Sequence, residues 1–230
     1  MSTVEMIKLI AHALGELNDR AVFVGGATVP FYLPPVFLPQ IRPTEDIDVV
    51  MEIVGRRTKW INEDALRAKG FTHDTSEGAP ICRWVYRNLK VDIMSTDASA
   101  FGFTNRWYQE GVDTAIEVET NPVSVKIFSL PYFLGSKIEA FKSRGRDDYR
   151  GSTDMEDIIA VLEVAPENLF EGMLLATSKG LQFYLKEEFQ KFTLSRDFLD
   201  ALPGIVFNRT NSHEAARNLI ERMKTFSKQL

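Results

Sequence analysis

The stretch RPTEDIDVVMEI, residues 42–53, places two acidic residues inside a segment that otherwise has the pattern of a buried strand. Successive side chains of a strand point to opposite faces, so Asp46 and Asp48 lie on one face, two residues apart. Two neighbouring carboxylates repel each other, and burying either is costly unless a positive group lies between them. The segment therefore predicts a strand with an anionic site on one face that requires a cation.

The composition is that of a soluble globular protein, with 44% hydrophobic and 26% charged residues among 230. No apolar run approaches the roughly eighteen residues that a membrane span requires. The first helix pattern carries Glu5 and Lys8 and lacks a small-residue cleavage site, so we expect no signal peptide and a cytoplasmic protein without membrane contact. The net charge of −5 argues against sequence-blind nucleic-acid binding, although it is compatible with a local basic patch.

The hydrophobic patterning changes near residue 130, from mixed helices and strands to helices alone. A Ser2-x-x-Glu5 capping box opens the first helix, and a hairpin is expected around Asn88. Helices are expected over residues 2–19 and 58–70, and strands over 21–24, 81–87, 89–95, 115–119 and 123–128. Helical periodicity then covers residues 130–145, 152–164, 169–192 and 212–226. This division predicts an α/β domain over residues 1–129 and a helical region over 130–230.

A third acid, Asp92, lies between the strand residues Val91 and Ile93. If its strand lies near the one that carries Asp46 and Asp48, the three carboxylates converge within a few strand spacings of about 4.8 Å. Three acids in one place suit Mg²⁺ or Mn²⁺, which prefer oxygen ligands. The alternative is that all three are ordinary surface acids, which are common in proteins.

A glycine pair, Gly25-Gly26, follows the strand AVFV and precedes Thr28. Glycines at such a turn let the backbone N–H groups approach a phosphate closely, although the pair alone is more often a tight turn. The pair matches neither the GxxxxGK[ST] nor the GxGxxG pattern, which excludes the P-loop and dinucleotide-binding interpretations.

Two cations, Lys137 and Arg144, fall within the apolar stripe of the helix pattern over residues 130–145. Cations on a buried face require anions, which the acidic cluster and a bound polyphosphate would supply. The alternative is snorkelling, in which the aliphatic stem is packed and the charged head reaches water. In the next helix Asp154 lies on the buried side and Asp157 borders it. Asp154 also suits the first turn of a helix, where the dipole favours acids.

Taken together, these motifs resemble the DNA polymerase beta-like nucleotidyltransferase superfamily, and more specifically the AbiEii/AbiGii abortive-infection toxins. The resemblance covers roughly residues 22–162 and rests on four motifs in the same order. They are VGGAT, RPTEDID with Arg42, Thr44, Asp46 and Asp48, SKIEAFKSRG with Lys137 and Arg144, and STDMEDI with Asp154 and Asp157.

The resemblance implies an α+β nucleotidyltransferase fold, in which a small mixed β-sheet flanked by helices is followed by a helical C-terminal region that completes the active site. It implies transfer of a nucleoside monophosphate from ATP, GTP or CTP to an acceptor hydroxyl, with Mg²⁺, or Mn²⁺, as cofactor. The implied metal ligands are Asp46, Asp48 and Asp92. The implied catalytic residues are these three with Lys137, Asp154 and Asp157. The implied nucleotide-binding residues are Gly25, Gly26, Thr28, Arg42, Thr44, Lys137 and Arg144.

The resemblance also implies a biological role as a toxin that modifies tRNA or another cellular target, with a cognate antitoxin as partner. Lys142, Arg146 and Arg150 are expected to be available to an RNA acceptor. Three alternatives remain open: an antibiotic-type nucleotidyltransferase that acts on small molecules, an Asp-x-Asp glycosyltransferase, and a binding module without catalysis. The glycosyltransferase would not need the glycine pair or the stacked cations, and a relic site would have lost at least one acid.

Overall fold

The computed structural model describes residues 1–51, 58–99, 101–145, 147–207 and 209–229. The chain divides into two compact units. Unit 1 comprises Met1–Pro30 and Arg42–Ser129, and unit 2 comprises Phe31–Ile41 and Leu130–Leu230. The main division falls after residue 129, where the strand patterns end. It differs from the expected ranges 1–129 and 130–230 in assigning Phe31–Ile41 to the helical unit.

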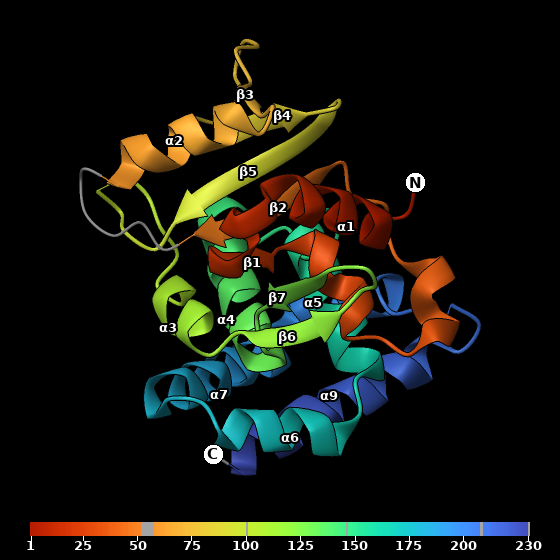
Figure 1. Cartoon of the computed structure of the whole chain (residues 1–230). Helices are drawn as coiled ribbons and strands as arrows, with labels where there is room; N and C mark the ends of the chain where they lie inside the picture. Colours follow the sequence, from red (N-terminus) through yellow and green to blue (C-terminus); the bar gives the residue numbers. More distant parts are fainter. Residues whose placement is uncertain (52–57, 100, 146, 208, 230) are drawn as a thin grey trace. The chain divides into compact units, whose positions relative to one another are not determined.

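Unit 1 is built on a mixed sheet of seven strands in the order β3-β4-β5-β2-β1-β7-β6 (Figure 1). The strands are β1 (Ala21–Val24), β2 (Asp46–Met51), β3 (Thr72–His73), β4 (Arg83–Tyr86), β5 (Leu89–Ser95), β6 (Ile116–Glu119) and β7 (Ser124–Ile127). The pairs β2–β5 and β1–β7 are parallel, and the remaining pairs are antiparallel. The expected small mixed sheet flanked by helices is confirmed.

Three α-helices belong to unit 1: α1 (Thr3–Leu14), α2 (Thr58–Ala68) and α3 (Tyr108–Asp113). The expected capping box opens α1, because the Ser2 hydroxyl accepts from the Glu5 amide at 3.3 Å and the Glu5 carboxylate accepts from the Ser2 amide at 2.6 Å. Two 3₁₀ segments, η1 (Gly15–Arg20) and η2 (Gly26–Phe31), flank β1. The two short elements β3 and α3 carry no periodicity long enough to be predicted.

The hairpin that joins β4 to β5 has a two-residue turn, Arg87-Asn88. Both residues have positive φ, 47° and 69°, as the hairpin turns that match strand twist require. This turn fixes the register, so that Arg83 pairs with Asp92 and Val85 with Lys90.

The proline-rich segment Phe31–Ile41 packs with unit 2 through its aromatic side chains. The ring of Tyr32 lies 4.8 Å from that of Phe133, and the ring of Phe37 lies 6.1 Å from that of Phe207. Part of the segment forms a 3₁₀ helix, η3 (Pro35–Gln40). Its large apolar residues therefore make it a packed part of the helical unit.

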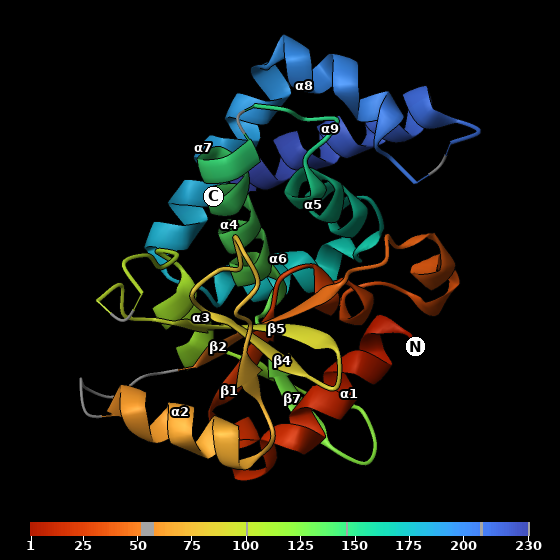
Figure 2. The same ribbon diagram turned by 90° about the horizontal axis from the view of Figure 1, so that it is seen from above.

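Unit 2 is helical throughout its described elements. They are α4 (Leu130–Ala140), the π-helical turn η4 (Phe141–Gly145), α5 (Thr153–Val164), α6 (Glu167–Leu175), α7 (Lys179–Leu194), α8 (Arg196–Ala201), the 3₁₀ turn η5 (Leu202–Gly204) and α9 (Ser212–Gln229). Helix α4 packs against α5 and α7, and α7 packs against α9 (Figure 2). The continuous pattern over residues 169–192 is interrupted where Ser178 caps α7 by accepting from the Leu181 amide at 3.2 Å.

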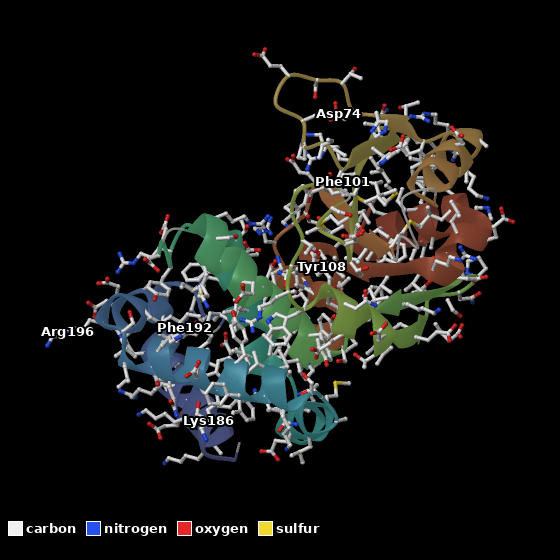
Figure 3. The ribbon with its side chains drawn as sticks, turned by 90° about the vertical axis from the view of Figure 1, so that its left-hand side faces the viewer. Asp74, Phe101, Tyr108, Lys186, Phe192 and Arg196 are labelled. Carbon is white, nitrogen blue, oxygen red and sulfur yellow. The ribbon has the colours of Figure 1, made fainter. Side chains whose placement is uncertain are left out.

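An aromatic cluster of Phe141, Phe192 and Phe198, with Tyr149 from the turn after η4, joins η4, α7 and α8 within unit 2. Of these residues, Phe192 of α7 is labelled in Figure 3. Ring centroids in the cluster lie 5.1 to 6.3 Å apart, in the range of favourable aromatic pairs. No helix in the described part of the chain is long and apolar enough to cross a membrane.

Candidate active site

The three predicted acids lie on one face of the sheet of unit 1, where β2 and β5 run in parallel. Asp48 is directly paired with Asp92 in this register. Asp46 shares their face because it lies two residues before Asp48. The alternate positions Ile47 and Val49 are fully buried, so the opposite face anchors β2 in the core. We call the positions of Asp46, Asp48 and Asp92 the acidic face.

The acidic face has a cation from within the chain, Arg83 at the start of β4. Its Nε and Nη2 donate to the two carboxylate oxygens of Asp92, both at 2.7 Å. Its Nη2 also donates to Oδ2 of Asp46 at 3.1 Å. These hydrogen bonds to Asp92 raise the pKa of the Arg83 guanidinium above its ordinary value. In this structure an arginine is thus the positive group that lies between Asp46 and Asp92.

Two further residues, Thr44 and Gly25, lie next to the carboxylates of the acidic face. The Thr44 hydroxyl donates to Oδ1 of Asp46 at 3.1 Å. Gly25 has a φ of +71°, and a Cβ added there would lie only 2.0 Å from Oδ2 of Asp48. The glycine is therefore needed both for its left-handed backbone and for the close approach of a carboxylate.

The other predicted nucleotide-binding residues of unit 1 lie in the sequence between β1 and β2. Gly26 begins η2, and the buried Thr28 donates its hydroxyl to the carbonyl of Gly25 at 2.9 Å. Arg42 donates from Nη1 to the carbonyl of Pro43 at 3.2 Å. Contacts of these residues with a nucleotide stay a prediction.

The three carboxylates of the acidic face are of the ligand type that Mg²⁺ and Mn²⁺ prefer, and the strand register brings them to one face. As the side chains stand, however, Arg83 holds two of the three acids. Among the residues that the structure describes, no group of three or more His, Cys, Asp or Glu side chains could hold a metal ion. The role of Asp46, Asp48 and Asp92 as metal ligands stays a prediction.

The predicted cations and acids of the helical region form a second cluster, within unit 2. The Nζ of Lys137 lies 2.9 Å from Oδ1 of Asp154 and 2.6 Å from Oδ2 of Asp157. All three side chains are at most 8% exposed. Burial opposes the charge on Lys137, but the carboxylates of Asp157 and Asp154 outweigh it and raise the pKa of the ammonium group. We call Lys137, Asp154 and Asp157 the buried ionic cluster.

Arg144 also binds Asp154, through Nε at 2.8 Å and Nη2 at 2.9 Å. Burial would raise the pKa of the Asp154 carboxyl, but the Arg144 hydrogen bonds and the charge of Lys137 lower it below its ordinary value. The Arg144 side chain is 69% exposed, so its predicted place on the buried stripe is wrong. The π-helical turn η4 accounts for the difference, because it changes the register that a regular α-helix would have continued.

Two of the three cations expected to be available to RNA have partners in unit 2. Lys142 lies 3.0 Å from the buried carboxylate of Glu188, so the expectation that it is unpaired is wrong. Lys142 and Lys191 together hold the pKa of Glu188 below its ordinary value against the effect of burial. Arg150 donates to the carbonyl of Asp200 at 3.0 Å, and Arg146 lies outside the described residues.

Arg83 is the residue of the acidic face that the sequence analysis missed. A two-residue turn at 87–88 pairs Tyr86 with Leu89 and, three positions further from the turn, Arg83 with Asp92. The position of the turn in the sequence is therefore enough to place Arg83 opposite Asp92. In the sequence Arg83 stands inside the apolar strand pattern ICRWVYR, which gives no indication of a contact with an acid. Its contact with Asp46 could not have been found in the same way, because it depends on how β2 pairs with β5.

Comparisons with known proteins support the fold. No protein-family model and no curated protein matches the chain. Among solved structures, an antigenic nucleotidyltransferase-like protein from Paracoccidioides brasiliensis matches with a TM-score of 0.53 and 21% identity, covering 94% of this chain and 92% of that one. JHP933 from Helicobacter pylori matches with a TM-score of 0.48 and 14% identity, covering 99% of this chain and 93% of that one. No conclusion is based on this second match. The chain therefore has a nucleotidyltransferase-like fold.

Proposed function

We propose that this protein is a nucleotidyltransferase that transfers a nucleoside monophosphate from a nucleoside triphosphate to an acceptor hydroxyl. The observation that carries the proposal is the pairing of Asp48 with Asp92 on adjacent parallel strands, with Asp46 on the same face. The nucleotidyltransferase-like fold and the glycine turn that contacts Asp48 support it. A glycosyltransferase or a relic site would not require this combination.

In the proposed reaction the acceptor oxygen attacks the α-phosphorus, the bond from that phosphorus to the bridging oxygen breaks, and pyrophosphate leaves. Asp92 would accept the proton of the acceptor hydroxyl. The backbone N–H groups at Gly25 and Gly26 would contact phosphates. Asp46, Asp48 and Asp92 would hold Mg²⁺ or Mn²⁺, which when bound supplies charge neutralisation at the reacting phosphate. Roles for Lys137, Arg144, Asp154 and Asp157 rest on the family resemblance alone.

We further propose, from the resemblance to the AbiEii/AbiGii toxins, that the acceptor is tRNA or another cellular target and that an antitoxin is a partner. A small-molecule acceptor is the second candidate. It is favoured by the contacts of Lys142 with Glu188 and of Arg150 with Asp200, which engage two cations otherwise suited to an RNA backbone.

The test is to incubate the protein with Mg²⁺, each α-labelled nucleoside triphosphate, and either total tRNA or a panel of hydroxyl-bearing small molecules. We expect label from the α position on one acceptor class, and none with Asp48→Asn or Asp92→Asn proteins that melt as the wild type does. Transfer from the γ position, or from a nucleotide sugar only, would overturn the proposal. Absence of any thermal stabilisation by Mg²⁺ with the four nucleotides would do the same.

A further inference from the structure

Arg83 makes the most extensive ionic contact of the acidic face. It reaches Asp92 through two parallel hydrogen bonds of 2.7 Å and Asp46 through a third of 3.1 Å. The side chains of Arg83 and Asp92 are only 17% and 11% exposed. A planar guanidinium in this fork geometry makes two charge-assisted hydrogen bonds to one carboxylate, which are about twice as strong as neutral ones.

The position of Arg83 is set by the pairing of the strands in the sheet. Strand β4 pairs with β5 so that Arg83 is opposite Asp92, and β5 pairs with β2 so that Asp92 is opposite Asp48. The guanidinium and the three acids therefore share one face across three adjacent strands. An arginine bound to the carboxylate oxygens of Asp46 and Asp92 occupies the oxygen atoms that a divalent ion would need as ligands.

We propose that Arg83 is the built-in counter-ion of the acidic face, and that a divalent cation binds there only by displacing it from Asp92 and Asp46. The proposal rests on the proposed function, which supplies the reason for a metal at this face. It makes Arg83 a positioning residue, since it holds the two acids in the metal-free protein. Arginine and metal then compete for the same oxygens, so the arginine lowers the affinity of the site for the ion.

The direct test is Mn²⁺ binding without nucleotide, measured by electron paramagnetic resonance of the free ion. Arg83→Met keeps the aliphatic stem and removes the charge. We expect it to bind Mn²⁺ roughly ten- to a hundred-fold more tightly than the wild type, since it need not break charge-assisted hydrogen bonds. The matched control is Arg67→Met, which removes an exposed arginine of α2 paired with Glu63 and Asp64. It should bind Mn²⁺ as the wild type does.

Thermal melts supply a second readout that a purely structural arginine would not give. The metal-free Arg83→Met protein should melt below the wild type, because the acids repel each other without a cation. Mn²⁺ should restore its melting temperature and raise that of the wild type less. Adding Asp92→Asn to Arg83→Met should remove most of this response to Mn²⁺. A folded Arg83→Met protein with Mn²⁺ affinity equal to or below that of the wild type would overturn the proposal.

If Arg83→Met does not fold, the wild-type protein still decides the matter. The Nε–H of Arg83 donates to Asp92 in the metal-free state, and its ¹H–¹⁵N signal is identified as the one lost in Arg83→Lys. Saturating Mg²⁺ should shift this signal and speed its exchange with water, and an unchanged signal would overturn the proposal. Metal-dependent nucleotidyl transfer with unchanged Arg83 contacts would refute this inference alone. Displacement of Arg83 by metal without any transfer would refute only the proposed function.

Discussion

The acidic face of unit 1 and the buried ionic cluster of unit 2 use the same chemistry in different surroundings. Each sets one cation against two aspartates at hydrogen-bonding distance, Arg83 in the acidic face and Lys137 in the buried ionic cluster. On the acidic face the side chains of Asp46 and Asp92 are 38% and 11% exposed, whereas those of Asp154 and Asp157 are 2% and 6% exposed. The acidic face lies on one side of a sheet, and the buried ionic cluster joins α4 and α5.

This difference in burial predicts a difference in role. Water and ions can reach a partly exposed carboxylate, so its cation can be exchanged at modest cost. A buried carboxylate that loses its cation is left as an uncompensated charge, which is strongly destabilising. We therefore expect the acidic face to exchange its cation and the buried ionic cluster to act as a fixed structural contact.

The largest expected effect is that of Lys137→Met, which leaves Asp157 without its lysine. Breaking a buried ion pair of this kind costs about 3–5 kcal/mol, so urea denaturation should show a loss of that size in the free energy of unfolding. The control is Lys191→Met, which removes a 62% exposed lysine from Glu188 and should cost no more than about 1 kcal/mol. Equal losses of unfolding free energy in the two variants would contradict the expectation that a buried lysine stabilises the fold more than an exposed one.

The pH dependence of stability should reveal part of the same effect. The pKa of Asp154 is lowered in the folded protein. Its contribution to the free energy of unfolding is therefore fully present above pH 3.8, the ordinary pKa of the group, and is lost as the pH falls through the folded-state pKa. The pKa of Lys137 is raised, so its contribution is present below 10.5 and is lost at higher pH. Unfolding free energies measured from pH 2 to 7 should fall less steeply below pH 3.8 in Asp154→Asn than in the wild type. Parallel curves would contradict this assignment.

A smaller effect is expected for Gly25→Ala, which tests the packing of the acidic face. The left-handed φ alone should cost about 1–2 kcal/mol, as it should in Gly78→Ala, where φ is +80° and an added Cβ meets nothing within 4 Å. At Gly25 the Cβ must also displace the Asp48 carboxylate, so the loss should exceed that of the control. Urea denaturation of both variants compares the costs, and equal losses would show that Asp48 moves away freely.

The smallest expected effect on stability is that of Thr44→Val, which removes the hydroxyl that holds Asp46. Loss of this hydrogen bond should cost about 0.5–1.5 kcal/mol, comparable to Thr114→Val, whose hydroxyl donates to the carbonyl of Glu110. Only Thr44→Val should also weaken Mn²⁺ binding, because residues that orient a metal ligand tune its affinity. Unchanged Mn²⁺ affinity in a folded Thr44→Val protein would exclude Thr44 from the metal site.

Local features of the sequence predicted most of the secondary structure. The capping box at Ser2 and Glu5 forms as expected, and so does the hairpin at 87–88. These features depend on residues within a few positions of each other, where side-chain chemistry and backbone preference act directly. The elements that were missed, β3, α3 and α8, span at most six residues each and have too few positions to show a period.

The sequence by itself determined that Asp46 and Asp48 share a face, because the alternation of a strand is a local property. Only the tertiary structure decided that Asp92 lies opposite Asp48 and that Arg83, which the hairpin places opposite Asp92, also reaches Asp46. That arrangement requires β5 to pair in parallel with a strand more than forty positions earlier in the chain, and no local preference encodes such a pairing. The same holds for Lys137, whose two aspartate partners come from the facing helix α5. The helical periodicity indicated that the charge of Lys137 required an anion, and the packing of α4 against α5 supplied Asp154 and Asp157.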